Sequence, residues 1–295
     1  MLKRQLKLSL NRLPLNNQTQ WYPGHIAKLD RELDQYLKQL DLVVEVLDAR
    51  IPISTWHQDL SERLRAKCPV LLVLNKSDLS DPNYTEPWLV QFRKTYPATL
   101  AFEATTGKGK NKMVEKLLAL GEPKFKQLEA KGLKRRPLRV GVVGMPNVGK
   151  SSLINALVGK KKVKTGHRAG VTRQTQWVRI HPQVELLDTP GLIPPRLESE
   201  EIGIHLAWVY SIGDRAFEEE DVLPSFLTQV ESLYPGMLQQ VLDLPPISPL
   251  SIEAIARRRG YLLPGDQEDL RRTAQAVLKD FRHGRLGRLT LERPV

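Results

Sequence analysis

The sequence predicts an α/β protein with a doubly wound, mostly parallel sheet, followed by a small α-helical domain. Up to about residue 195, short apolar runs alternate with helix-like segments, a pattern typical of parallel strands covered by helices on both faces. The string GMPNVGKS at 144–151 has the form of a phosphate-binding loop between a strand and a helix. Beyond residue 195, strand-like runs give way to helical segments separated by Pro/Gly turns. We therefore expect two domains, 1–195 and 196–295.

The elements of the first domain follow from this alternation. The expected strands are the apolar runs at 41–48, 69–76, 98–104, 138–144, 176–180 and 184–188. The expected helices lie at 26–40, 56–66, 86–95, 111–119 and 150–158.

Composition narrows the class of protein. The 295 residues contain 41% hydrophobic residues, enough for a real core. No apolar run is long enough to span a membrane, and the charged N-terminal stretch is a poor signal peptide. The single cysteine, Cys68, lies beside a hydrophobic run, which favours a buried reduced thiol. We expect a cytoplasmic protein with no membrane partner.

The positive charge is concentrated in the first domain. The net charge is +12, but residues 1–195 hold 33 basic and 17 acidic side chains. Two runs carry much of the excess, each with seven basic residues: 124–139 and 160–179. Each run alone could be a solvated loop; together they favour a nucleic-acid partner.

The phosphate-binding loop is the strongest chemical signal. Its amides and the N-terminus of the following helix suit phosphate oxygens, and Gly149 allows close backbone approach. Lys150 would meet the β- and γ-phosphates, which makes it a catalytic candidate as well, and the Ser151 hydroxyl can ligate Mg²⁺. The remaining binding candidates in this loop are Asn147, Val148 and Ser152.

Two further segments complete a predicted magnesium and γ-phosphate site. The string DTPG follows a strand, so Asp188 is placed to hold Mg²⁺ through water and the Gly191 amide to meet a γ-phosphate. Between this string and the phosphate-binding loop, Thr172 lies in a polar loop where a threonine would complete the Mg²⁺ shell.

The string NKSD at 75–78 predicts guanine specificity. The Asp78 carboxylate can accept hydrogen bonds from N1–H and the 2-amino group of guanine, a pair that adenine lacks. Asn75 would support the loop, Lys76 would lie along the base, and Ser77 belongs to the same loop. The string EATTG at 103–107 would supply a backbone amide, at Ala104 or Thr105, to the guanine oxygen.

These motifs stand in a permuted order. In an ordinary GTPase the phosphate-binding loop comes first, whereas here NKSD and EATTG precede it and DTPG follows it. The same sheet can form if the basic run 124–137 joins the original ends. The chain then leaves the nucleotide domain just after DTPG, so we expect the helical domain to sense the nucleotide.

With this order and these motifs, the chain resembles the circularly permuted P-loop GTPases of the YlqF/YawG group. The resemblance also covers WYPGHIAK at 21–28, LDARIP at 47–52 and the C-terminal FRHGRLGRLTLE. It implies GTP hydrolysis coupled to late maturation of the large (50S) ribosomal subunit, with GTP-bound docking on a precursor of rRNA and ribosomal proteins, and release on hydrolysis. It also implies that the helical domain helps to bind the ribosome; we expect the protein to be a monomer. Asn147 matches an asparagine linked to K⁺-stimulated hydrolysis, which adds K⁺ as a candidate cofactor.

The source of a catalytic side chain is the remaining question. Small GTPases place a water-orienting glutamine directly after DTPG-type strings, but Leu192 occupies that position. His25 is the candidate from within the chain, since an imidazole can position or deprotonate water, and the resemblance points to the same histidine. The alternative is that His25 only caps a helix.

Two other functions stay open at this point. The chain could be a nucleotide-gated RNA- or protein-binding module whose hydrolysis is incidental. It could also be a GTPase that acts on tRNA or at a membrane, although neither an amphipathic anchor nor a second catalytic motif supports this.

Overall fold

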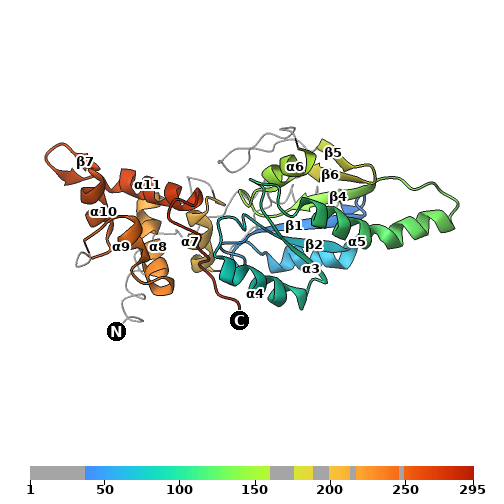
Figure 1. The fold of residues 1–295 in the computed structure, drawn as a ribbon, viewed down its shortest axis with the longest axis horizontal. Helices are drawn as coiled ribbons and strands as arrows, with labels where there is room; N and C mark the ends of the chain where they lie inside the picture. The colour runs from blue at the N-terminus through green and yellow to red at the C-terminus, as the bar shows by residue number, and fades with distance from the viewer. Residues whose placement is uncertain (1–36, 160–175, 189–198, 213–216, 246–248) are drawn as a thin grey trace.

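The computed structural model describes residues 37–159, 176–188, 199–212, 217–245 and 249–295, with only the backbone of Gln176 and Asp188. Its centre is a six-stranded sheet in the order β3-β2-β1-β4-β6-β5 (Figure 1). Only β5, at one edge, runs antiparallel to its neighbour, β6. The strands are β1 Leu42–Asp48, β2 Val70–Asn75, β3 Ala98–Phe102, β4 Leu138–Val143, β5 Gln176–His181 and β6 Val184–Asp188. The predicted mostly parallel α/β fold is confirmed.

Helices cover both faces of this sheet. On one face, α3 Gln58–Lys67 and α4 Pro82–Arg93 pack against side chains such as Val43 and Leu47 of β1. On the other face, α5 Lys110–Ala130 and α6 Lys150–Val158 pack against Val44 and Val46. The alternation along β1 therefore buries both faces, which explains why its sequence is continuously apolar.

Two helices differ from their predicted bounds. We expected one at 86–95, but α4 begins at Pro82, because Asp81 caps it by accepting from the Asn83 N–H at 2.9 Å and proline suits the first turn. We expected another at 111–119, but α5 continues to Ala130. The first half of the predicted connector 124–137 is therefore helical, and only its second half crosses to β4.

The helical part follows the sheet. It contains α7 Glu200–Trp208, α8 Glu219–Leu233, α9 Met237–Val241, α10 Ile252–Arg259 and α11 Leu270–Arg282. A short hairpin lies between α10 and α11, where we expected no strands. Its two strands, β7 Leu262–Leu263 and β8 Gln267–Glu268, have two residues each. Helices α8 and α11 pack together, with the Phe226 and Phe281 rings 4.9 Å apart. No helix in the described ranges is long and apolar enough to cross a membrane.

The last residues return from α11 to the sheet (Figure 1). The Leu289 N–H donates to the Leu79 carbonyl at 3.1 Å, and the Leu291 N–H donates to the Arg50 carbonyl at 2.8 Å. The Glu292 carboxylate accepts from the N–H groups of Ile53 and Ser54. The C-terminal segment thus lies against loops that leave β1 and β2.

Candidate functional site

The predicted nucleotide motifs meet at the carboxyl edge of the sheet. Strand register pairs Asp48 of β1 with Asn75 of β2, and Asn75 with Phe102 of β3. On the other side, Val142 of β4 pairs with Asp188 of β6. The loops after β2, β3 and β4 therefore leave the sheet together, which is where ligands bind in open α/β sheets.

The phosphate-binding loop follows β4 and requires its glycines. Gly144 has φ +148°, and a Cβ there would lie 2.3 Å from the Val46 carbonyl oxygen. Gly149 has φ +96°, and a Cβ there would lie 2.3 Å from Asn75 Nδ2. The backbone of the loop passes so close to Val46 and Asn75 that neither position has room for a side chain.

Lys150 begins α6 with its ammonium inside this loop. The residue is buried, and Nζ donates to the carbonyl oxygens of Gly144 at 3.1 Å and Met145 at 2.9 Å. Ser151 and Ser152 lie in the same first turn, which has no side-chain cap. A cation and uncapped amide groups at one helix start form an environment suited to phosphate.

The NKSD loop is tied to the phosphate-binding loop. Asn75 is fully buried and donates from Nδ2 to the Val148 carbonyl at 2.9 Å. Lys76, in the left-handed region at φ 60°, donates from Nζ to the Asn147 carbonyl at 2.5 Å. Side chains of the predicted base loop thus donate hydrogen bonds to the backbone of the phosphate-binding loop.

The EATTG loop completes this arrangement. Thr105 Oγ1 donates to Asp78 Oδ2 at 2.8 Å, and the Ser77 hydroxyl donates to the Phe102 carbonyl at 3.1 Å. Ala104 is half-buried beside them and packs on the core. The two loops predicted to meet one base therefore lie in direct contact.

Asp48 joins this site at the end of β1. Its carboxylate accepts from Arg50 Nε at 2.9 Å and Nη2 at 2.7 Å, and from Lys76 Nζ at 2.9 Å. Burial acts to raise the pKa of Asp48, but the two cations outweigh it and hold that pKa well below its usual range. Burial also lowers the pKa of Lys76. The string LDARIP is the sequence signal for this pair, because it places Asp48 and Arg50 at the end of a strand, at the same edge of the sheet as NKSD.

The helical part contacts the same site at three places. Arg50 stacks on the Phe281 ring of α11, with its guanidinium carbon 4.7 Å from the ring centroid. Arg288 donates to the Ser77 carbonyl at 2.8 Å, on the NKSD loop. Asn147 Nδ2, on the phosphate loop, donates to the Tyr210 carbonyl at 2.5 Å. We expected a connection only through the segment after DTPG; the described contacts add one through the base loop.

Several predicted residues lie outside the described ranges: His25, Thr172, Gly191, Leu192 and the side chain of Asp188. Their roles stay predictions. So does K⁺ at Asn147, whose amide donates to Tyr210. The predicted thiol of Cys68 is buried and free.

Comparisons with known proteins agree with this geometry. The family model described as "50S ribosome-binding GTPase" matches residues 139–229. Ribosome biogenesis GTPase A of Bacillus pumilus is 38% identical over 93% of this chain and 98% of its own length. The protein of the same name from Priestia megaterium is 40% identical over 93% of this chain and 96% of its own. A GNP-bound structure of YlqF from T. maritima matches with TM-score 0.61 and 27% identity, covering 90% of this chain and 98% of that one.

Proposed function

Because the chain belongs to the ribosome biogenesis GTPase A family, we propose that this GTPase acts in late maturation of the large ribosomal subunit. It docks on a precursor particle in its GTP-bound form, and hydrolysis releases it. The observation that carries this proposal is the contact of the helical part with both nucleotide loops, through Arg288 to the base loop and through Tyr210 to the phosphate loop. Such contacts let a change at the nucleotide reach a docking domain.

The base loops would select guanine. Asp78 accepts from Thr105 in the described arrangement and would accept from guanine N1–H and the 2-amino group when nucleotide binds. A backbone amide at Ala104 or Thr105 would donate to the guanine oxygen. The Lys76 stem would lie along the ring.

The phosphate loop would bind the triphosphate through its amides and Lys150. The ammonium exchanges the carbonyls of Gly144 and Met145 for phosphate oxygens, so it stays paired in both states. Ser151, Thr172 and Asp188 would hold Mg²⁺, and oxygen donors of this kind suit that hard ion. When bound, Mg²⁺ neutralises charge on the β- and γ-phosphates.

Hydrolysis would use His25 to position the attacking water. Leu192 follows DTPG and offers no polar group for this task. We expect His25→Ala to lower particle-stimulated GTPase turnover and to keep the affinity for GDP. Unchanged stimulated turnover would remove His25 from the mechanism.

Co-sedimentation with large-subunit precursor particles tests the docking proposal. The protein is incubated with particles in GDP, GTP or a non-hydrolysable GTP analogue, and the bound fraction is measured. We expect strong association with the analogue, less with GTP and least with GDP. Equal association in all three would show that the nucleotide does not control docking.

A further inference from the structure

We propose that the groove between α4 and α5, at the β3 edge of the sheet, binds the sugar–phosphate backbone of RNA. This inference rests on the proposed function, because it assigns a surface to the RNA of the particle. The groove is about 780 Å³ in volume and adjoins the end of the EATTG loop, since Gly107 is among its lining residues. Five cationic residues and one acidic residue line it: Arg93, Lys108, Lys110, Lys112, Lys116 and Glu86.

Three of the five cationic residues that line the groove have no acidic partner in the part of the chain that the structure describes. Arg93 pairs with Glu86 at 2.7 Å and Lys108 pairs with Glu103 at 3.0 Å. By contrast, Lys110, Lys112 and Lys116 make no ion pair with any acidic residue in the described ranges. The groove therefore keeps a positive charge that its own walls do not neutralise.

Several residues of the basic run 124–139 are paired with acidic residues, whereas most of the run 160–179 lies outside the described ranges. In the run 124–139, Lys124 and Arg136 pair with Asp41, and Arg135 pairs with Glu129. The arginine triplet at the end of α10 is paired as well, with Glu268, Asp243 and Asp280. The groove differs in that unpaired lysines, Lys112 and Lys116 among them, line one hollow of the surface.

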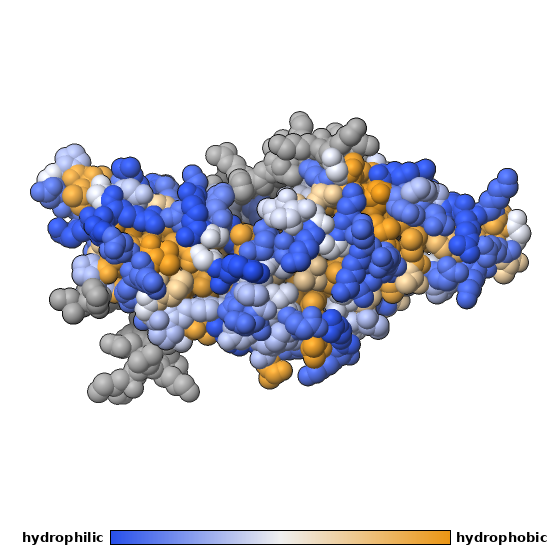
Figure 2. Space-filling model, in the orientation of Figure 1, coloured by the Kyte–Doolittle hydropathy of each residue, from blue (hydrophilic) through white to orange (hydrophobic). Residues whose placement is uncertain are grey.

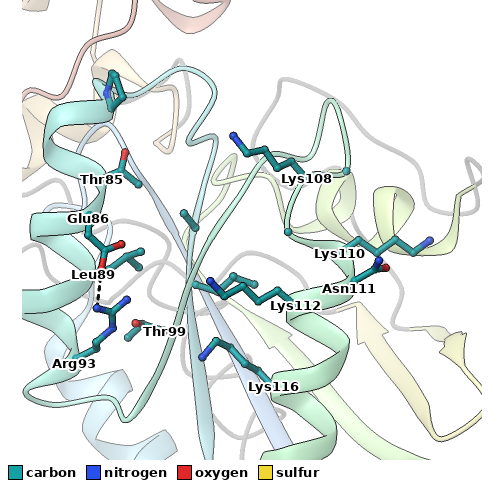
Figure 3. Close-up of a pocket in the computed structure, with 15 residues that line it drawn as sticks. Thr85, Glu86, Leu89, Arg93, Thr99, Lys108, Lys110, Asn111, Lys112 and Lys116 are labelled. Carbon is teal, nitrogen blue, oxygen red and sulfur yellow. Dashed lines mark hydrogen bonds and ion pairs between the residues drawn. The ribbon is translucent and has the colours of Figure 1, made fainter.

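Three of the four lysine side chains that line the groove point into it. Lys108, Lys112 and Lys116 extend toward α4, whereas Lys110 points the other way (Figure 3). Figure 2 shows hydrophilic side chains gathered over the first half of α5. Lys112 and Lys116 are four residues apart on one helix face, about 6 Å along the axis, and like charges at this spacing repel. A nucleic-acid strand carries one phosphate per roughly 3.4 Å, so these two ammonium groups can contact neighbouring phosphates and lose their repulsion.

Two further features favour an anionic ligand. Helix α5 begins at Lys110 without a side-chain cap, so its amide groups add partial positive charge at the same end as the lysines. On the floor, Thr99 is 3% exposed, and its hydroxyl has no hydrogen-bond partner in the described part of the chain.

A peptide strand is the competing occupant, because β3 is an edge strand of the sheet. Lysines beside an edge discourage the addition of a further strand. Its charge instead complements a polyanion.

The test is binding of a fluorescent RNA hairpin by the full-length protein. The variant is Lys112→Glu/Lys116→Glu, and the matched control is Lys38→Glu/Lys67→Glu, which makes the same charge change at two exposed lysines outside the groove and outside both basic runs. We expect the first variant to bind the hairpin about tenfold more weakly or worse. Its plot of log affinity against log salt concentration should be shallower by about two phosphate contacts. The control should stay close to the unchanged protein, and GDP affinity should be the same in all three.

The outcomes separate the groove from the proposed function. Equal hairpin binding by variant and control would overturn the groove. So would preferential binding of an unlabelled acidic peptide, or aggregation of the variant without loss of RNA affinity, since the lysines would then only protect the β3 edge. Any of these three results overturns the groove alone. The proposed function still stands if the unchanged protein associates with particles in a GTP-dependent way. If the unchanged protein shows no GTP-dependent association with particles, the proposed function is wrong.

Discussion

A buried carboxyl on the central strand makes the stability of this protein depend on pH. Glu45 is 2% exposed and accepts hydrogen bonds from Ser61 and from Tyr96, the latter at 3.0 Å. Burial raises the pKa of Glu45 to about 7, against the opposing effect of these hydrogen bonds. The protonated form is thus favoured by folding. Its contribution to stability is complete below the ordinary pKa of 4.5 and is lost as pH rises through about 7.

Glu45→Gln should therefore remove this pH dependence. We expect the variant to gain stability relative to the unchanged protein as pH rises from about 5 to about 8, by up to about 3 kcal/mol. Urea unfolding at several pH values measures the difference. Glu115→Gln, at an exposed position on α5, is the control and should give a constant difference. A constant difference for Glu45→Gln as well would mean that Glu45 is ionised in the folded protein.

Asp48 is the residue on which the ion cluster of the site depends. Asp48→Asn removes the one carboxylate between Arg50 and Lys76 and leaves the fully buried Arg50 cation without its partner. We expect a loss of about 3–5 kcal/mol in the free energy of unfolding and weaker GDP binding. Glu86→Gln breaks an exposed pair with Arg93 instead and should cost about 0–1 kcal/mol. Similar losses in the two variants would show that the Asp48 cluster contributes no more than a surface pair.

At the residue scale, the sequence predicts those site residues whose role can be assigned from their neighbours in the chain. Lys150 and Asp78 stand in short strings directly after apolar strands, so neighbouring residues sufficed to assign them. The contacts of Asp48 with Lys76, of Asn75 with Val148 and of Thr105 with Asp78 join residues that are far apart in the chain. No local pattern specifies such contacts, because they depend on how the strands pair.

At the scale of elements, the C-terminal segment is the part that sequence patterning could not place. The segment after Gly284 has no helical or strand periodicity, and we assigned it to the helical domain. The structure holds it against loops after β1 and β2 by hydrogen bonds such as Leu289 to Leu79. Its partners lie some two hundred residues earlier, so only the assembled sheet reveals the contact. By contrast, the start of α4 has a local signal, because Asp81 is a capping residue and Pro82 suits the first turn. Pro87 disfavours a helix that continues through it, and the expected start was therefore placed at 86.

Glu292 anchors this segment and gives an element-scale prediction. Its carboxylate accepts from the N–H of Ile53 at 2.6 Å and of Ser54 at 3.0 Å. Glu292→Ala leaves these donors without a partner, so we expect a loss of about 1–3 kcal/mol. Amide hydrogen exchange should rise at Ile53, Ser54 and Leu291. Glu253→Ala, at an exposed position in α10, should change neither measurement. Unchanged exchange at Ile53 and Ser54 in Glu292→Ala would show that the segment is held by other contacts.

At the scale of the whole molecule, the permuted order has a consequence for cooperativity. One hydrophobic core runs from Val44 and Val46 of the sheet to Phe226 and Phe281 of the helical part. The chain enters the helical part after β6 and returns through the C-terminal segment. The two parts are thus joined by both covalent connectivity and packing, and we expect them to unfold in one transition.

Substitutions at two buried residues of α11 can distinguish an effect on stability from an effect on nucleotide binding. Phe281 is 1% exposed and stacks under Arg50, whereas Leu278 is fully buried in the same core. We expect Phe281→Ala to cost about 3–5 kcal/mol and Leu278→Ala about 2–5 kcal/mol in the free energy of unfolding. Only Phe281→Ala should also weaken GDP binding, because Arg50 loses the ring that holds it against Asp48 and, through Asp48, Lys76. Titration with a fluorescent GDP analogue at a temperature where both variants are folded measures this. Equal GDP affinities would mean that the helical part is coupled to the nucleotide by contacts other than Arg50 and Phe281, and would shift attention to Arg288 and Tyr210.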